Sequence, residues 1–209
     1  MEELDKVLQA LDVVERYEEY LFRRIWGKML IVIGIVFPLG AIISLNATLL
    51  ASVLGLDAEI VSLLANLIIF TFLMGYIAYS FYESWKTVGD RPDEETQDKL
   101  HGPLIGLVWF FSFILTSFAP ESLRLVSLLW AASVSCLLSF LILRAVGSHG
   151  RVKVLFLLGI SLGVVSFPLL LISDTVLLGY LSLTAFSICF IVAGLAMNRM
   201  ATEMLRPRA

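Results

Sequence analysis

The fold follows from a long apolar stretch, residues 29–80, which reads "MLIVIGIVFPLGAIISLNATLLASVLGLDAEIVSLLANLIIFTFLMGYIAYS". Its only charged residues, Asp57 and Glu59, lie near the middle. A helix needs about 20 predominantly apolar residues to cross a bilayer, and this stretch is more than twice that length. The sequence therefore predicts two membrane-spanning helices joined by a short turn near Asp57.

Two further stretches follow the same plan. Residues 104–143 carry only Glu121 and Arg124 as charges, and residues 154–198 carry only Asp174. Because a backbone in lipid must satisfy its own hydrogen bonds, we expect every span to be helical. The predicted fold is an all-α integral membrane protein with six transmembrane helices arranged as three hairpins. The predicted spans are about 29–45, 60–80, 104–119, 123–143, 154–173 and 176–197.

The chain outside these spans has its own character. A composition of 59% hydrophobic and 16% charged residues excludes an ordinary soluble domain. Residues 46–56 are apolar enough either to lengthen the first span or to form a short helix at the membrane surface. The predicted transmembrane domain covers residues 27–198 and includes an acidic cytoplasmic loop at residues 83–101. Residues 199–209 follow it as a short basic cytoplasmic tail.

The basic residues indicate the orientation. Arg124 is the only one of the 15 lysines and arginines that falls in an outer turn when the amino terminus is placed inside. Lysine and arginine concentrate on the cytoplasmic side of membrane proteins. We therefore expect a multi-pass protein of the cytoplasmic (plasma) membrane with both termini in the cytoplasm. The bilayer is its expected partner, and no nucleic acid is expected.

The three hairpins share an order of features. In each, the first helix carries a Phe–Pro element, an acidic residue opens the returning helix, and a serine follows within the next turns. Acidic residues at a helix start complement the helix dipole, so the agreement also arises from common membrane chemistry. The sequence leaves open whether a two-helix unit was triplicated. The serines are Ser62, Ser127 and Ser182.

Small residues recur along single faces of the later spans. In a bilayer, helices associate through close backbone approach at small residues. The fifth span contains a Gly-x-x-x-Gly motif, and the sixth repeats the spacing with serine, alanine and cysteine. We interpret these faces as helix-packing surfaces in preference to a polar permeation path. The packing residues predicted in spans four and five are Ser127, Ala131, Ser135, Ser139, Gly159 and Gly163.

Residues 1–26 form a second kind of segment. Apolar residues recur there at spacings of mostly three and four with charged residues between them, the pattern of an amphipathic helix. An apolar stripe needs a partner, and the acidic polar face disfavours an anionic lipid surface. We predict a cytoplasmic helix whose residues 1–25 contact a second copy of the chain or another membrane or cytoplasmic protein.

The loop of residues 83–101 gathers the carboxylates that come nearest to a metal site. Oxygen ligands of this kind hold Mg²⁺ or Ca²⁺, but their spacing matches no metal-binding pattern. Pro92 followed by three acids is instead typical of a solvated helix start. No cofactor and no catalytic residue are predicted. The weak metal candidates are Asp90, Asp93, Glu94 and Asp98.

Asn66 is the most unusual residue within a predicted span. An amide in hydrocarbon needs a partner, and such residues mark either a functional site or a hydrogen bond between helices. We favour the hydrogen bond, and the alternative is an intramembrane polar site of Asn66, Ser62, Ser127 and Ser182. Asn46 begins an Asn-x-Thr glycosylation pattern on the predicted outer side. Its closeness to the membrane predicts that it carries no glycan.

The functional expectation rests on what the spans lack. No ionisable side chain lies deep within a predicted span, which argues against a proton-coupled transporter or ion pump. The sequence also contains none of the nucleotide-binding, zinc-protease or serine-hydrolase motifs. We expect a non-enzymatic membrane protein that forms an oligomer or a complex subunit. The alternatives are a small-solute channel or facilitative carrier, and an enzyme at the inner headgroup layer that uses residues 90–101.

Overall fold

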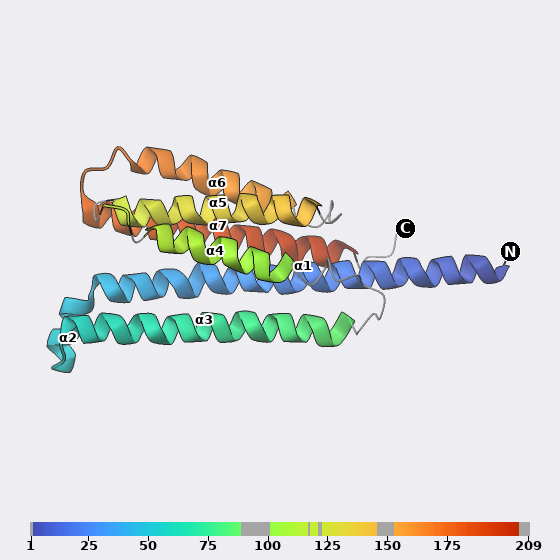
Figure 1. Ribbon diagram of the computed structural model, residues 1–209, viewed down its shortest axis with the longest axis horizontal. Coiled ribbons are helices and arrows are strands. Elements are labelled where there is room, and N and C mark those ends of the chain that lie inside the picture. The colour runs from blue at the N-terminus through green and yellow to red at the C-terminus, as the bar shows by residue number, and fades with distance from the viewer. Residues whose placement is uncertain (1, 89–100, 117, 121–122, 146–152, 205–209) are drawn as a thin grey trace.

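The computed structural model describes residues 2–88, 101–116, 118–120, 123–145 and 153–204 (Figure 1). No strand occurs within these ranges, which confirms an all-helical fold for the part of the chain that they cover. The helices are α1 (Glu2–Leu45), α2 (Ala47–Leu54), α3 (Ala58–Val88), α4 (His101–Thr116), α5 (Arg124–Ala145), α6 (Lys153–Leu169) and α7 (Thr175–Met204).

Four of these helices are long and apolar enough to cross a membrane. They contain the segments Glu19–Leu45, Ala58–Ser80, Arg124–Ala145 and Thr175–Met204. The apolar helices α4 and α6 are shorter. The described residues thus fit a helical bundle embedded in a membrane, and each of the six predicted spans overlaps one helix.

The amino-terminal helix and the first span form one continuous helix. The sequence suggested two segments that meet near Trp26, but α1 runs without a break from Glu2 to Leu45. The physical reason is that a helix keeps its backbone hydrogen bonds satisfied both in water and in lipid, so a change of solvent does not require a change of backbone. Pro38 lies inside α1 and also leaves it unbroken.

Short polar and glycine signals end and restart the helices at the turns. Gly55, with a φ of 68°, ends α2 in the left-handed conformation, and its N–H bonds to the carbonyl of Ala51. Asp174 accepts the backbone N–H groups of Val176 at 2.9 Å and Leu177 at 3.0 Å and so caps α7. Residues 47–54 thus form a short helix of their own in place of a longer first span, and its location at the membrane surface stays a prediction.

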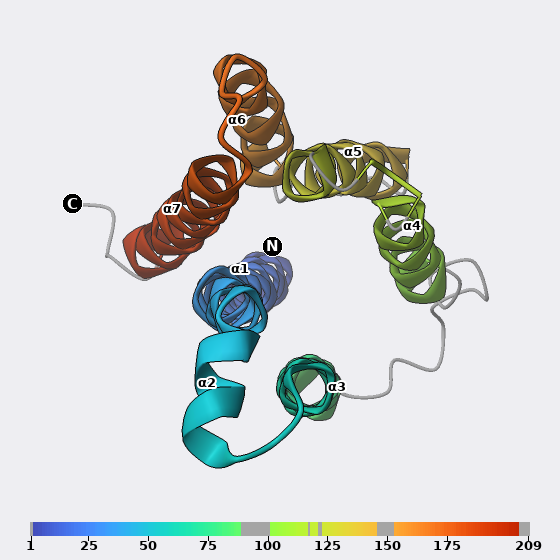
Figure 2. The same cartoon turned by 90° about the vertical axis from the view of Figure 1, so that its left-hand side faces the viewer.

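The helices form an arc around α1. Figure 2 shows α4, α5, α6 and α7 in sequence on one side of α1, and α3 on the other side. Consecutive members of the arc contact one another, α7 packs along α1, and α3 packs against α1 and α2. The two helices of each predicted hairpin are therefore neighbours in space.

Aromatic side chains fill the space between α1, α4 and α7. The ring of Phe37 lies 5.2 Å from Phe186 and 6.0 Å from Phe113, measured between centroids. Phe186 and Phe190 stack at 4.2 Å, and Trp109 meets Phe190 edge-on at 6.4 Å. Large planar rings in mutual contact stabilise the packing beyond the area that they bury.

The backbones of α1 and α7 approach each other closely at glycines. A Cβ added to Gly194 would lie 2.5 Å from the carbonyl oxygen of Gly27, and one added to Gly27 would lie 2.8 Å from the carbonyl oxygen of Gly194. Gly34 continues this line, since its added Cβ would lie 2.9 Å from the Cβ of Phe190. We call Gly27, Gly34 and Gly194 the glycine crossing. No spacing pattern in the sequence predicts packing at these three glycines.

We expect Gly194→Ala to destabilise the protein by about 1–3 kcal/mol, because the new methyl group must push the α1 backbone away. Gly106→Ala in α4 is the matched control, since its added Cβ meets nothing within 4 Å. Thermal unfolding in detergent, followed by intrinsic fluorescence, measures both. Equal melting temperatures for the two variants would contradict a tight crossing.

Candidate functional site

A small polar cluster joins α1 to α3 at the surface of the apolar bundle. The Ser44 hydroxyl donates to Asn66 Oδ1 at 3.2 Å, and Asn66 Nδ2 donates to Ser62 Oγ at 3.5 Å. The first of these bonds connects two helices, as we expected for Asn66. The second is at the long limit of hydrogen-bond geometry and stabilises the amide only weakly.

An open hollow of about 450 Å³ lies beside this cluster. Its lining comes entirely from the first turns of α3 and combines a carboxylate, a hydroxyl and an amide with apolar carbon. Asn66 is exposed, so the hollow lies on the outer surface of α3 and does not run through the centre of the bundle. The lining residues are Ala58, Glu59, Ser62, Leu63 and Asn66.

The other two serines of the predicted polar site lie on different helices. Ser127 in α5 donates to the carbonyl of Arg124 in its own helix at 2.7 Å. Ser182 in α7 is almost fully buried, and its hydroxyl has no hydrogen-bond partner among the described residues. The structure therefore brings Ser62 and Asn66 together, while Ser127 and Ser182 have separate surroundings.

The small-residue faces of α5 and α6 pack against neighbouring helices. On α5, Ala131, Ser135 and Ser139 are buried, and Ser139 accepts the indole N–H of Trp109 from α4 at 3.1 Å. Ser127, at the start of the same face, is only half-buried. One serine face thus supplies a hydrogen-bond acceptor to a neighbouring helix.

The Gly-x-x-x-Gly motif of α6 packs against α5. A Cβ on Gly159 would lie 2.8 Å from Leu137 Cγ, and one on Gly163 would lie 3.2 Å from the hydroxyl oxygen of Ser133. That hydroxyl donates to the carbonyl of Gly159 at 2.7 Å. The sequence predicted packing at this motif but did not identify its partner. Ser133 is not among the predicted packing residues of α5. Its hydrogen bond to α6 became evident only from the structure.

The predicted metal candidates lie outside the described residues, as does most of the loop that carries them. Of the histidines, His101 begins α4. Within the described ranges, histidine, cysteine and carboxylate side chains form no group of three that could hold a metal ion. For the acidic loop itself, the solvated helix start stays a prediction.

Asn46 connects the carboxyl-terminal end of α1 to α7. Its Nδ2 donates to the carbonyl of Ile42 at 2.8 Å and to the Tyr180 hydroxyl at 3.0 Å. Both N–H groups of the amide therefore have acceptors, and one acceptor belongs to a helix far away in the sequence. Thr48, which completes the glycosylation pattern, lies in the first turn of α2.

Comparisons of the chain with protein-family models, curated proteins and solved structures found no match. The features of this chain that bear on function are the polar cluster on α3, the serine and glycine contacts between helices, and the long helix α1.

We expect Asn46 to carry no glycan when the protein is produced in a glycosylating host. The amide nitrogen that would receive the sugar is held in two hydrogen bonds, and the pattern lies at a helix start against α7. Mass spectrometry of the intact protein and glycosidase treatment check this. A mass increase that glycosidase removes, and that Asn46→Gln abolishes, would contradict it.

Proposed function

We propose that this chain is a non-enzymatic, multi-pass protein of the plasma membrane that works as an oligomer or as a subunit of a larger complex. Six helices cross the bilayer as three hairpins, with both termini in the cytoplasm. Residues 1–25 supply one assembly contact on the cytoplasmic side. The absence of a catalytic motif from the sequence is the reason for proposing an assembly role in place of a reaction.

The lengths and directions of the helices support six crossings. At 1.5 Å per residue, α4 and α6 are about 24–26 Å long, close to the thickness of the hydrocarbon layer. The start of α1 and the end of α7 point to the same end of the bundle (Figure 1). An even number of crossings has this consequence.

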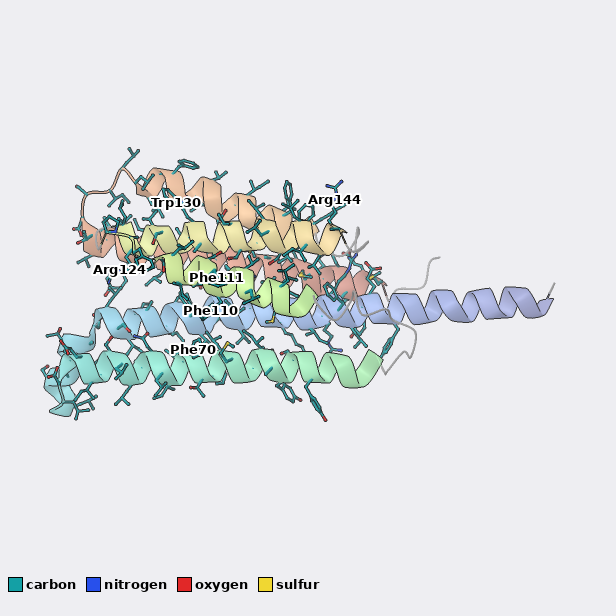
Figure 3. All side chains as sticks on the ribbon, in the orientation of Figure 1. Phe70, Phe110, Phe111, Arg124, Trp130 and Arg144 are labelled. Carbon is teal, nitrogen blue, oxygen red and sulfur yellow. The ribbon has the colours of Figure 1, made fainter. Side chains whose placement is uncertain are left out.

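The positions of basic residues support the proposed orientation. Figure 3 shows Arg124 and Arg144 at opposite ends of α5. Arg144 lies in the last turn of α5 and Lys153 begins α6, and both of these helix ends lie where α1 enters the bundle (Figure 1). This is the basic side that the cytoplasm normally faces.

The observation that carries the assembly role is the extension of α1. In Figure 1, the amino-terminal part of α1 runs beyond the described ends of the other helices. Residues 2–18 alone are about 26 Å long at the rise of an α-helix. Their sequence bears an apolar stripe opposite an acidic face, and a helix of this kind is stable in water when another surface covers the stripe.

We expect removal of residues 2–18 to lower the assembly state while the bundle still folds, since the span Glu19–Leu45 remains. A full-length variant with Leu4→Gln, Leu8→Gln and Leu11→Gln should have the same effect, whereas Asp5→Gln with Asp12→Gln is the matched control on the acidic face. Detergent-corrected sedimentation gives the mass of each. A wild-type chain that sediments as a monomer, with no associated protein in pull-downs from its own membranes, would overturn the proposal.

A small-solute channel or facilitative carrier is the second candidate, and the hollow beside Asn66 favours it. Its lining of Glu59, Ser62 and Asn66 would give a solute polar contacts from the start of α3 into the hydrocarbon layer. In that case, liposomes with the wild-type chain should take up a solute, and Asn66→Leu should reduce the rate at least about tenfold, as loss of a required polar contact does. Equal rates in empty and protein-containing liposomes across a solute panel would exclude this candidate.

A further inference from the structure

Of the four described helices long enough to span a membrane, α3 is the least buried. Only 6% of its spanning window is buried, compared with 28% for α1 and 39% for α5 and for α7. It packs against α1 and α2. Exposure to lipid is normal in a membrane helix and does not by itself indicate a binding surface. The exposed face of α3 differs because it carries a polar side chain, Asn66.

Asn66 lies where lipid cannot satisfy it. It is eight residues from the start of α3 at Ala58, which places it about 12 Å along a helix of 1.5 Å rise, inside the hydrocarbon layer if α3 spans as proposed. A carboxamide has two N–H donors and an oxygen with two lone pairs. Asn66 uses one lone pair for Ser44 and one N–H for a 3.5 Å contact to Ser62. The rest of its capacity has no partner among the described residues.

The hollow exposes the remaining N–H and lone pair of the Asn66 amide to a partner outside the molecule. It opens on the surface of α3, and Asn66 forms part of its wall. The exposed side chains Leu63, Leu67 and Phe70 surround the amide at the spacing i, i+3, i+4 and i+7 of one helix face. We call Leu63, Asn66, Leu67 and Phe70 the Asn66 face, and Figure 3 shows Phe70 on α3.

We propose that the Asn66 face binds the Asn66 face of a second copy of this chain, which rests on the assembly role proposed above. Copies inserted in one membrane share one orientation. A two-fold axis normal to the membrane therefore places the two Asn66 side chains at the same depth in the bilayer. The amide is both donor and acceptor, and a two-fold pair therefore forms matching hydrogen bonds. A different partner would need a polar group at this same depth. No charged residue lies between Ile60 and Ser80, so like charges do not oppose the contact within the bilayer.

The contact is the kind that stabilises helix pairs in lipid. Polar side chains such as asparagine hydrogen-bond across transmembrane helices, because the alternative is an unsatisfied group in hydrocarbon. Around the central pair, the leucines and Phe70 would meet their own copies and exclude lipid from the amides. Glu59 lies about two turns from Asn66, exposed in the first turn of α3.

Cross-linking in liposomes tests the proposed face. The full chain carries Cys136→Ala and Cys189→Ala and one new cysteine, either Leu63→Cys on the Asn66 face or Leu195→Cys on the exposed side of α7. We expect a short thiol cross-linker to yield a dimer with Leu63→Cys and only background with Leu195→Cys. Adding Asn66→Leu should reduce the cross-linked dimer about fivefold or more. Equal yields of cross-linked dimer at the two cysteines, or a yield that Asn66→Leu leaves unchanged, would contradict the proposed contact between Asn66 faces.

Ser44→Ala separates a contact between copies from a role within one chain. It removes the bond from α1 but leaves the Asn66 amide intact, so the dimer should persist. A loss equal to that of Asn66→Leu would show that Asn66 acts only between α1 and α3 and would overturn the inference. Sedimentation of the wild type distinguishes the two proposals. If the wild type is an oligomer but Leu63→Cys gives no cross-linked dimer, only the proposed Asn66 face is wrong. If the wild type is a monomer without associated proteins, the proposed assembly role is wrong as well.

Discussion

The contact between Gly27 and Gly194 is the interaction on which the arrangement of the bundle depends. In lipid, no hydrophobic force draws helices together, so association relies on close contact and on hydrogen bonds. The two glycines let the backbones of α1 and α7 touch, since a methyl group on either would overlap a carbonyl oxygen of the other helix. This crossing joins the first helix of the bundle to the last, and it sets the position of the arc formed by α4, α5, α6 and α7.

Hydroxyl groups complete the connections that the glycines begin. Ser133 bonds to the carbonyl of Gly159 where α6 lies against α5, and Ser139 accepts from Trp109 where α4 lies against α5. Each bond satisfies a polar atom that lipid could not satisfy, and each occurs where a small residue permits close approach. Asn66 differs from these groups because it is exposed and only partly satisfied. That difference is why it is the centre of the proposed contact between copies.

Much of the fold was predictable from the sequence, and the candidate site was predictable in part. Asn66 stood out as an amide in a predicted span, but Ser44, its partner on α1, had no distinguishing signal among many serines. The sequence identified Gly159 and Gly163 as packing residues from their spacing. It missed Gly27 and Gly194, because isolated glycines form no motif until two helices are placed against each other.

The sequence alone determined that the chain is helical and apolar in long stretches, with charges at the turns, because these properties depend on each segment and on the solvent around it. It also indicated the caps at the helix starts, since a cap involves residues close together in the chain. Only the tertiary structure decided which helix lies beside which. Helix partners depend on how the surfaces of separate segments fit, and small residues at regular spacing show that a close neighbour exists without saying which helix it is.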